Sequence, residues 1–96
     1  MIDPKQSTKI NDEVLAERLR AHIKHQANSA EEQSWTSPNF LTILLEEVGE
    51  LAKAINEYRV ITNQPHKLGR ELRAELIQVS AMAQAWIVAI DEVFNV

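Results

Sequence analysis

The stretch 40–59 constrains this chain most, because its apolar residues recur at alternating spacings of three and four. That period predicts an amphipathic α-helix with one continuous apolar seam. The seam consists of Leu41, Leu44, Val48, Leu51, Ile55 and Tyr58. Beside it lie Glu46, Glu47 and Glu50, and like charges three or four residues apart destabilise an isolated helix by roughly 0.2–0.5 kcal/mol per pair. Gly49 costs a further ~1 kcal/mol relative to Ala. Two local costs at one place indicate a functional site that would gain from a bound cation.

Composition limits the class of protein. Ninety-six residues form one small domain, and the absence of cysteine excludes disulfides and thiolate metal sites. The formal net charge of −4 argues against a nucleic-acid binder, which normally has a basic face. Only two glycines and three prolines leave little room for the turns of an all-β fold. No apolar run approaches ~18 residues and no signal-peptide pattern is present. We therefore expect an all-α, cytoplasmic protein without a membrane partner.

The N-terminal third of the sequence predicts a polar arm followed by a helix with a narrow apolar stripe. Residues 1–10 are mostly polar, so we expect a flexible N-terminal arm before a helical domain over 11–96. Asn11 can cap a first helix that ends about Ala27, with acidic residues in its first turn where the helix dipole favours them. The narrow apolar stripe of this helix consists of Val14, Leu15, Leu19 and Ile23.

Capping signals place the two longer helices. The segment Ser29-Ala-Glu-Glu32 has the spacing of a capping box, which predicts a short helical turn. Ser37 as N-cap and Pro38 at the first helical position predict the start of the central helix. β-branched residues followed by a proline predict its end near 59–61. After a connection of roughly six to eight residues, the last helix is expected over 69–94.

The last helix carries a second polar face of Glu71, Glu75 and Gln78, spaced four and three residues apart. Two long helices joined by a short connection pack antiparallel as a helical hairpin. These side chains could then face Glu47, Glu50 or Glu57 across the pair. Both long helices have apolar residues on more than one side, and the thin first helix cannot cover them all. We therefore predict a homodimer or higher homo-oligomer, in which two hairpins form a four-helix-type bundle.

The acidic pattern resembles a known family. Glu46-Glu47-Val48-Gly49-Glu50, followed by Glu71-Leu-Arg-Ala-Glu75-Leu-Ile-Gln78-Val, is similar to the MazG-like all-α nucleoside triphosphate pyrophosphohydrolases, whose signature is EExxE followed by ExxD. The likeness covers roughly residues 35–92. The first half of the signature matches fully, and the second half departs. If Glu75 is the family's glutamate, its aspartate is Gln78 here; if Glu71 is, the aspartate is Ala74. We prefer the first register, because Gln78 keeps an oxygen donor on the site face.

The resemblance implies a metal-dependent reaction. Members of the family place Mg²⁺ or Mn²⁺ on their acids and hydrolyse an NTP or dNTP to the monophosphate and pyrophosphate. The implied catalytic acids are Glu46, Glu47, Glu50 and Glu75. The implied metal ligands are Glu47, Glu50 and Glu75, with Gln78 as a weak ligand and Glu71 in reserve. Candidates for contact with the nucleoside triphosphate substrate are Lys53, Arg70, Arg73 and Trp35.

Other interpretations of the same residues stay open. Glutamates on a helix are usually a solvated face, and Trp35 is more often a hydrophobic plug at a helix entrance than a base-stacking residue. A non-catalytic helical dimerisation module with a degenerate metal site is the alternative function, because Gln78 replaces an acid. A di-iron carboxylate bundle needs Glu-x-x-His on its helices, and no glutamate in this sequence is followed three residues later by histidine.

Overall fold

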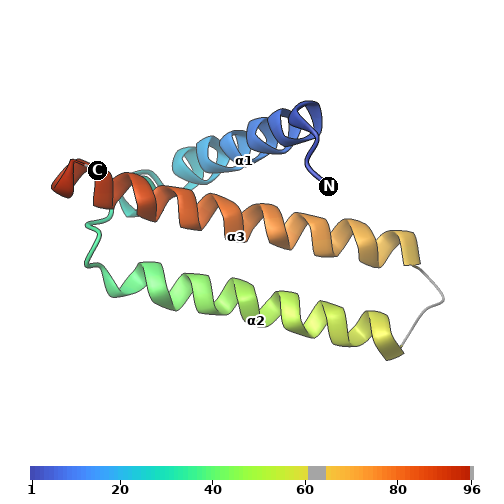
Figure 1. Ribbon diagram of the computed structural model, residues 1–96. Coiled ribbons are helices and arrows are strands. Elements are labelled where there is room, and N and C mark those ends of the chain that lie inside the picture. Colours follow the sequence, from blue (N-terminus) through green and yellow to red (C-terminus); the bar gives the residue numbers. More distant parts are fainter. Residues whose placement is uncertain (61–64, 96) are drawn as a thin grey trace.

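The computed structural model describes residues 1–60 and 65–95, and no strand occurs among them (Figure 1). Its elements are α1 (Pro4–His25), the short 3₁₀ helices η1 (Gln26–Asn28) and η2 (Ala30–Glu32), α2 (Pro38–Val60) and α3 (Pro65–Phe94). Helix α3 lies between the other two long helices and packs against both of them. Helices α2 and α3 run antiparallel along their whole lengths. The all-α class and the helical hairpin are therefore confirmed.

The boundaries of α2 agree with the predicted capping. The backbone N–H of Asn39 donates to Ser37 Oγ at 3.3 Å, so Ser37 satisfies one of the free amides at the start of the helix. The helix ends at Val60, inside the predicted range. Helix α3 begins at Pro65 rather than Gly69, because proline is compatible with the first turn of a helix. The predicted connection shrinks accordingly, and its residues 61–64 lie outside the described part of the chain.

Helix α1 begins at Pro4 rather than near Asn11, within the stretch that was expected to be a flexible arm. Asp3 explains the difference, because its Oδ1 accepts a hydrogen bond from the backbone N–H of Lys5 at 3.0 Å and caps the helix. The expected apolar stripe is also wrong. Val14 is buried at 1% exposure, but the other stripe residues Leu15, Leu19 and Ile23 are exposed, because α1 touches α3 along one narrow line.

An aromatic contact sets how far α2 and α3 are shifted along each other. Phe40, which is 1% exposed, stacks on Trp86 with ring centroids 5.4 Å apart and an interplanar angle of 6°. The indole N–H of Trp86 donates to the backbone carbonyl of Trp35 at 2.9 Å. Trp35 in turn meets Phe94 edge to face at 5.2 Å. Such aromatic pairs contribute both buried area and specific geometry. The start of α2 is thereby fixed to the second half of α3.

One broad apolar surface of the chain is uncovered. It comprises the exposed residues Leu41, Leu45, Val48 and Ile55 of α2 and Leu76 and Ile87 of α3, and we call it the uncovered face. In an antiparallel helix pair, each side chain that faces the partner helix is followed by one that points to a common side of the pair. Val48 and Leu76 are such following residues, so they belong to one surface. Exposed apolar surfaces of this kind mark interaction sites.

The apolar composition of helix α3 raises the question of whether it crosses a membrane. The segment His66–Phe94 is long and apolar enough to cross a membrane, with a mean hydropathy of 1.3 in its most apolar window. The core helix of a soluble bundle passes the same test of length and composition. Here the helix packs against both α1 and α2, and Ala81, Ala85 and Ala89 are buried, although only 17% of that window is buried within this one chain. One such helix therefore does not assign the protein to a membrane.

We expect Phe40→Ala to lower the free energy of unfolding by about 3–5 kcal/mol, because it removes a fully buried ring and leaves a cavity against Trp86. Urea unfolding followed by circular dichroism measures the change. Leu19→Ala on α1, where the side chain is 55% exposed, is the control and should stay within about 0.5 kcal/mol of the wild type. Equal losses in the two variants would contradict the importance of the aromatic contact.

Candidate metal centre

Three of the predicted acids meet between α2 and α3. Glu47 and Glu50 lie one turn apart on α2, and Glu75 approaches them from the antiparallel α3. One carboxylate oxygen from each residue lies within 4.8 Å of the other two. We call these three residues the acidic cluster. Neither helix alone could form it, because its members are brought together by the packing of α2 on α3.

Two oxygens of the acidic cluster are buried without a partner. Oε2 of Glu47 and Oε2 of Glu75 have no hydrogen-bond donor among the described residues. With one proton between them, the two carboxyls hydrogen-bond to each other, but when both are ionised neither buried oxygen has a donor. A buried, unpaired carboxylate oxygen costs free energy. Burial accordingly raises the pKa of Glu47 to about 7, aided by the contact with Glu75 and by the negative charges of Glu50 and Glu17.

The donor set of the acidic cluster fits a hard divalent cation. Carboxylate oxygens are the ligands that Mg²⁺, Mn²⁺ and Ca²⁺ prefer, whereas zinc sites normally use nitrogen and sulfur. At a metal–oxygen distance of about 2.1 Å, ligand oxygens on opposite sides of an octahedral ion lie about 4.2 Å apart. The spacing within the cluster is compatible with this arrangement. A cation there would supply the missing partner for both buried oxygens.

A cavity of about 400 Å³ borders the acidic cluster at Glu47, whereas Glu50 and Glu75 do not line it; Gln78, one turn after Glu75, lines it as well. Helix α1 and the 3₁₀ turns enclose it on one side, and α2 and α3 enclose it on the other. Its size lies in the usual range for sites that hold a small molecule. Helix α1 contributes the basic residues Arg18, Arg20, His22, Lys24 and His25 to the wall. Arg18 and Arg20 are paired with Glu31 and Glu17, which line the cavity too, so Lys24 is the lining cation without an acidic partner among the described contacts.

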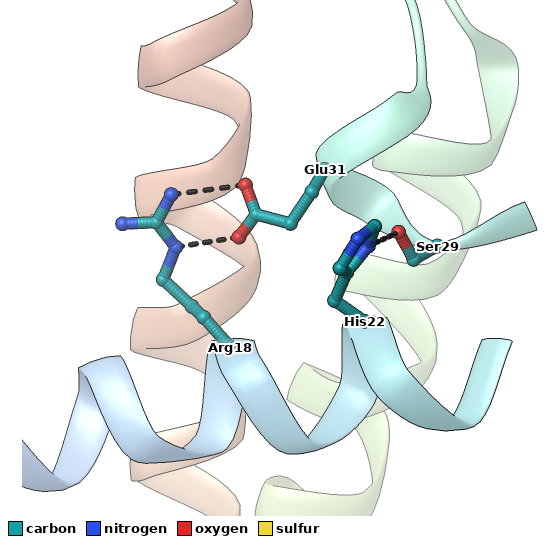
Figure 2. A network of polar contacts seen from close by, with 4 residues as sticks. All are labelled: Arg18, His22, Ser29 and Glu31. Atoms are coloured by element: carbon teal, nitrogen blue, oxygen red, sulfur yellow. Dashed lines mark hydrogen bonds and ion pairs between the residues drawn. The ribbon is translucent and has the colours of Figure 1, made fainter. Parts of the chain in front are cut away.

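A polar network holds the outer wall of the cavity in place (Figure 2). Arg18 of α1 donates two hydrogen bonds to the carboxylate of Glu31, at 2.6 and 2.9 Å. Nδ1 of His22 lies 2.6 Å from Oγ of Ser29, which is only 3% exposed. Such two-point Arg–carboxylate contacts are directional and strong. The predicted helical turn exists as η2, but the side chain of Ser29 bonds to His22 instead of capping it.

The contribution of α1 to the site was not predicted. Glu17 adds negative charge near Glu47, while its own carboxylate accepts two hydrogen bonds from Arg20 at 2.5 and 2.9 Å. The contact with Arg20 lowers the pKa of Glu17. The basic residues gathered in the second half of this helix, five of which line the cavity, were the available sequence signal for its contribution. The sequence does not encode how α1 is rotated against α3, so the role of Glu17 could not be predicted.

The remaining candidates lie outside the acidic cluster. Glu46, Glu71, Lys53 and Arg70 are exposed on their helices. Arg73 forms an ion pair with Glu13 and so links α3 to α1. This contact lowers the pKa of Glu13 and raises that of Arg73. Trp35 packs against Phe94 and is not among the residues that line the cavity. Its position agrees with the interpretation of Trp35 as a hydrophobic plug.

Comparisons of the chain with protein-family models, with curated proteins and with solved structures find no match. The resemblance to the MazG-like enzymes therefore stays a prediction based on the residues. Two observations carry the functional argument from this point. One is the acidic cluster with its two unpaired oxygens. The other is the cavity that meets this cluster at Glu47 and is also lined by Gln78.

We expect the protein to lose stability as pH rises from about 5 to about 8 in the absence of divalent cations. The pKa of Glu47 is about 7 in the folded state and near 4.5 in the unfolded chain, so the folded state binds more protons between these values. Stability from this group is full below pH 4.5 and lost as pH rises through 7. Thermal unfolding at several pH values measures the trend.

Glu47→Gln cannot ionise and should flatten this pH dependence. Glu46→Gln, at the exposed neighbouring position, is the matched control and should keep the trend of the wild type. An identical pH dependence in the wild type and Glu47→Gln would show that Glu47 titrates like an ordinary surface carboxyl.

Proposed function

We propose that this protein is a metal-dependent nucleoside triphosphate pyrophosphohydrolase, which converts an NTP or dNTP and water to the monophosphate and pyrophosphate. The acidic cluster beside a cavity that Lys24 and His25 of α1 also line is the observation that carries the proposal. Hydrolysis of a phosphoanhydride needs a hard cation near the phosphates and positive charge around them. The family resemblance of the EExxE segment on α2 supports this choice among phosphate-processing reactions.

In the proposed reaction, Glu47, Glu50 and Glu75 would hold Mg²⁺ or Mn²⁺, which would supply Lewis acidity toward phosphate oxygens. The oxygen of a water molecule forms a bond to the α-phosphorus, the bond between this phosphorus and the bridging oxygen breaks, pyrophosphate leaves, and the proton of the water is released to solvent. The cavity is large enough for the nucleoside, and its α1 wall presents Lys24 and His25 to anionic groups.

We also propose that the protein acts as a homodimer in the cytoplasm. The uncovered face carries large apolar side chains in two rows that lie side by side, one on each helix of the hairpin. These are Leu41, Leu45, Val48 and Ile55 on α2 and Leu76 and Ile87 on α3. A second hairpin of equal length and equal apolarity would bury it and complete a four-helix core. The cavity lies on the α1 side of the hairpin, so this pairing leaves the cavity accessible.

We expect the purified protein with Mg²⁺ or Mn²⁺ to release pyrophosphate and a monophosphate from at least one nucleotide in a screen of NTPs and dNTPs. Glu50→Gln should lower kcat/KM roughly 100-fold or more, because a bound cation contributes several kcal/mol to such reactions. Product analysis by chromatography measures both results. Glu57→Gln, an exposed acid further along α2, is the matched control and should keep full activity.

Each contrary outcome of this screen has a distinct meaning. Release of a diphosphate and orthophosphate would show that the cleavage position, and with it the family resemblance, is wrong. Absence of both hydrolysis and divalent-metal binding at millimolar Mg²⁺ or Mn²⁺ would favour the non-catalytic dimerisation module. Metal binding that Glu50→Gln abolishes, together with nucleotide cleavage, supports the enzyme.

We expect the wild type to have twice the mass of one chain in solution at micromolar concentration, and Val48→Glu to be monomeric. The substitution places a charge in the centre of the uncovered face, where burial in a dimer would cost several kcal/mol. Sedimentation or light scattering measures the mass. Leu19→Glu, on the exposed side of α1, is the control that should remain dimeric. A monomeric wild type would refute the dimer.

A further inference from the structure

Gln78 occupies the boundary between the acidic cluster and the cavity. It follows Glu75 by three residues on α3, so the two side chains leave the same side of the helix one turn apart. Gln78 is half-buried and lines the cavity together with Glu47. Its carboxamide makes no hydrogen bond to another described residue, although it offers two N–H donors and one oxygen acceptor.

The polar inventory of the cavity singles out this side chain. From α2 and α3 the cavity is lined by the apolar residues Ile43, Ala81, Met82 and Ala85, and by only two polar residues, Glu47 and Gln78. On the opposite wall, Arg18 is bound to Glu31 and His22 to Ser29. Gln78 is therefore the one neutral polar side chain that α2 and α3 present to this cavity. Such a position suits a recognition contact, because pockets for small molecules place few polar groups among many apolar ones.

The charges around the acidic cluster limit it to one cation. In two-metal sites the ions lie about 3.5–4 Å apart and each needs its own acidic ligands. The cluster provides three carboxylates within 4.8 Å of one another, which suit a single ion. Of the other acids nearby, Glu17 is bound to Arg20 and Glu31 to Arg18, and the exposed Glu46 and Glu71 lie outside the cluster. One turn after Glu75, Gln78 brings a neutral amide and no fourth carboxylate to this side of α3.

We propose that Gln78 is a ligand-recognition residue and not a metal ligand, and that each chain holds a single divalent cation, with the Gln78 amide N–H donating to an oxygen of the cation-bound polyphosphate. This inference rests on the proposed function, because it assumes that a polyphosphate binds at the acidic cluster. A carboxylate at this position would repel the phosphate oxygen that a carboxamide binds. With Gln78 at this position, the site gains a direct hydrogen bond to the substrate and lacks the carboxylate that a second cation would need.

Two titrations test the proposal with the whole chain. Free Mn²⁺, detected by electron paramagnetic resonance, gives the number of Mn²⁺ ions bound per chain. Calorimetry with inorganic tripolyphosphate at saturating Mn²⁺ gives the phosphate affinity without depending on any base. The variants are Gln78→Met, which keeps the side-chain volume but lacks the amide, and Gln78→Ala. Gln84→Met, at a half-buried position of α3 that does not line the cavity, is the matched control.

We expect one Mn²⁺ per chain in the wild type and unchanged Mn²⁺ affinity in Gln78→Met and Gln78→Ala. Tripolyphosphate binding should weaken about tenfold in both variants, the size expected for one hydrogen bond to a charged group. The control Gln84→Met should match the wild type in both titrations. Gln78→Asp should bind a second Mn²⁺, since it restores a fourth carboxylate.

Three results would overturn the proposal. They are two Mn²⁺ ions per wild-type chain, a loss of Mn²⁺ affinity in Gln78→Met as large as that in Glu50→Gln, and tripolyphosphate binding that is absent in the wild type or unchanged in both Gln78 variants. The proposed function fails separately. If the expected titrations are found but no nucleotide is hydrolysed, the recognition role of Gln78 stands and the pyrophosphohydrolase assignment falls.

Discussion

The antiparallel contact between α2 and α3 is the constraint on which the rest of this structure depends. The stacked rings of Phe40 and Trp86 hold the first turns of α2 against the second half of α3. Because both helices are rigid rods with a rise of about 1.5 Å per residue, this contact also sets what meets further along the pair. Glu47 is thereby brought opposite Glu75. A shift by one turn would separate the carboxylates and leave the cavity without an acidic edge.

The carboxylates of the acidic cluster repel one another, and a bound cation would relieve this repulsion. Glu47 and Glu75 each bury an oxygen without a partner, and the pKa of Glu47 rises to about 7 because burial and neighbouring negative charge oppose its ionisation. Folding alone gains nothing from this arrangement, so the packing of the aromatic residues must offset its cost. Such local conflicts are expected where a chain serves binding instead of stability. A bound divalent cation would replace the repulsion among these carboxylates with their attraction to the cation.

Helix α1 completes the site and covers only one side of the hairpin. It closes the cavity through the Arg18–Glu31 and His22–Ser29 contacts, which tie it to the 3₁₀ turns (Figure 2). The opposite side of the hairpin retains its large exposed apolar residues. The division suits a bundle in which one face binds a small molecule and the other binds a second hairpin. Both proposed roles depend on α3, which packs against α1 on one side and carries Leu76 and Ile87 of the uncovered face.

The sequence by itself determined the helical class, the start of α2 at Ser37 and Pro38, and the pairing of acidic faces on α2 and α3. These features follow from local periodicity and capping, which a short stretch of residues encodes. Only the tertiary structure decided that Glu46 and Glu71 lie outside the acidic cluster, that Arg73 pairs with Glu13, and that α1 supplies one wall of the cavity. These outcomes depend on how each helix is rotated about its axis and shifted against its neighbours. Contacts between residues far apart in the chain set those two quantities, and no local pattern records them.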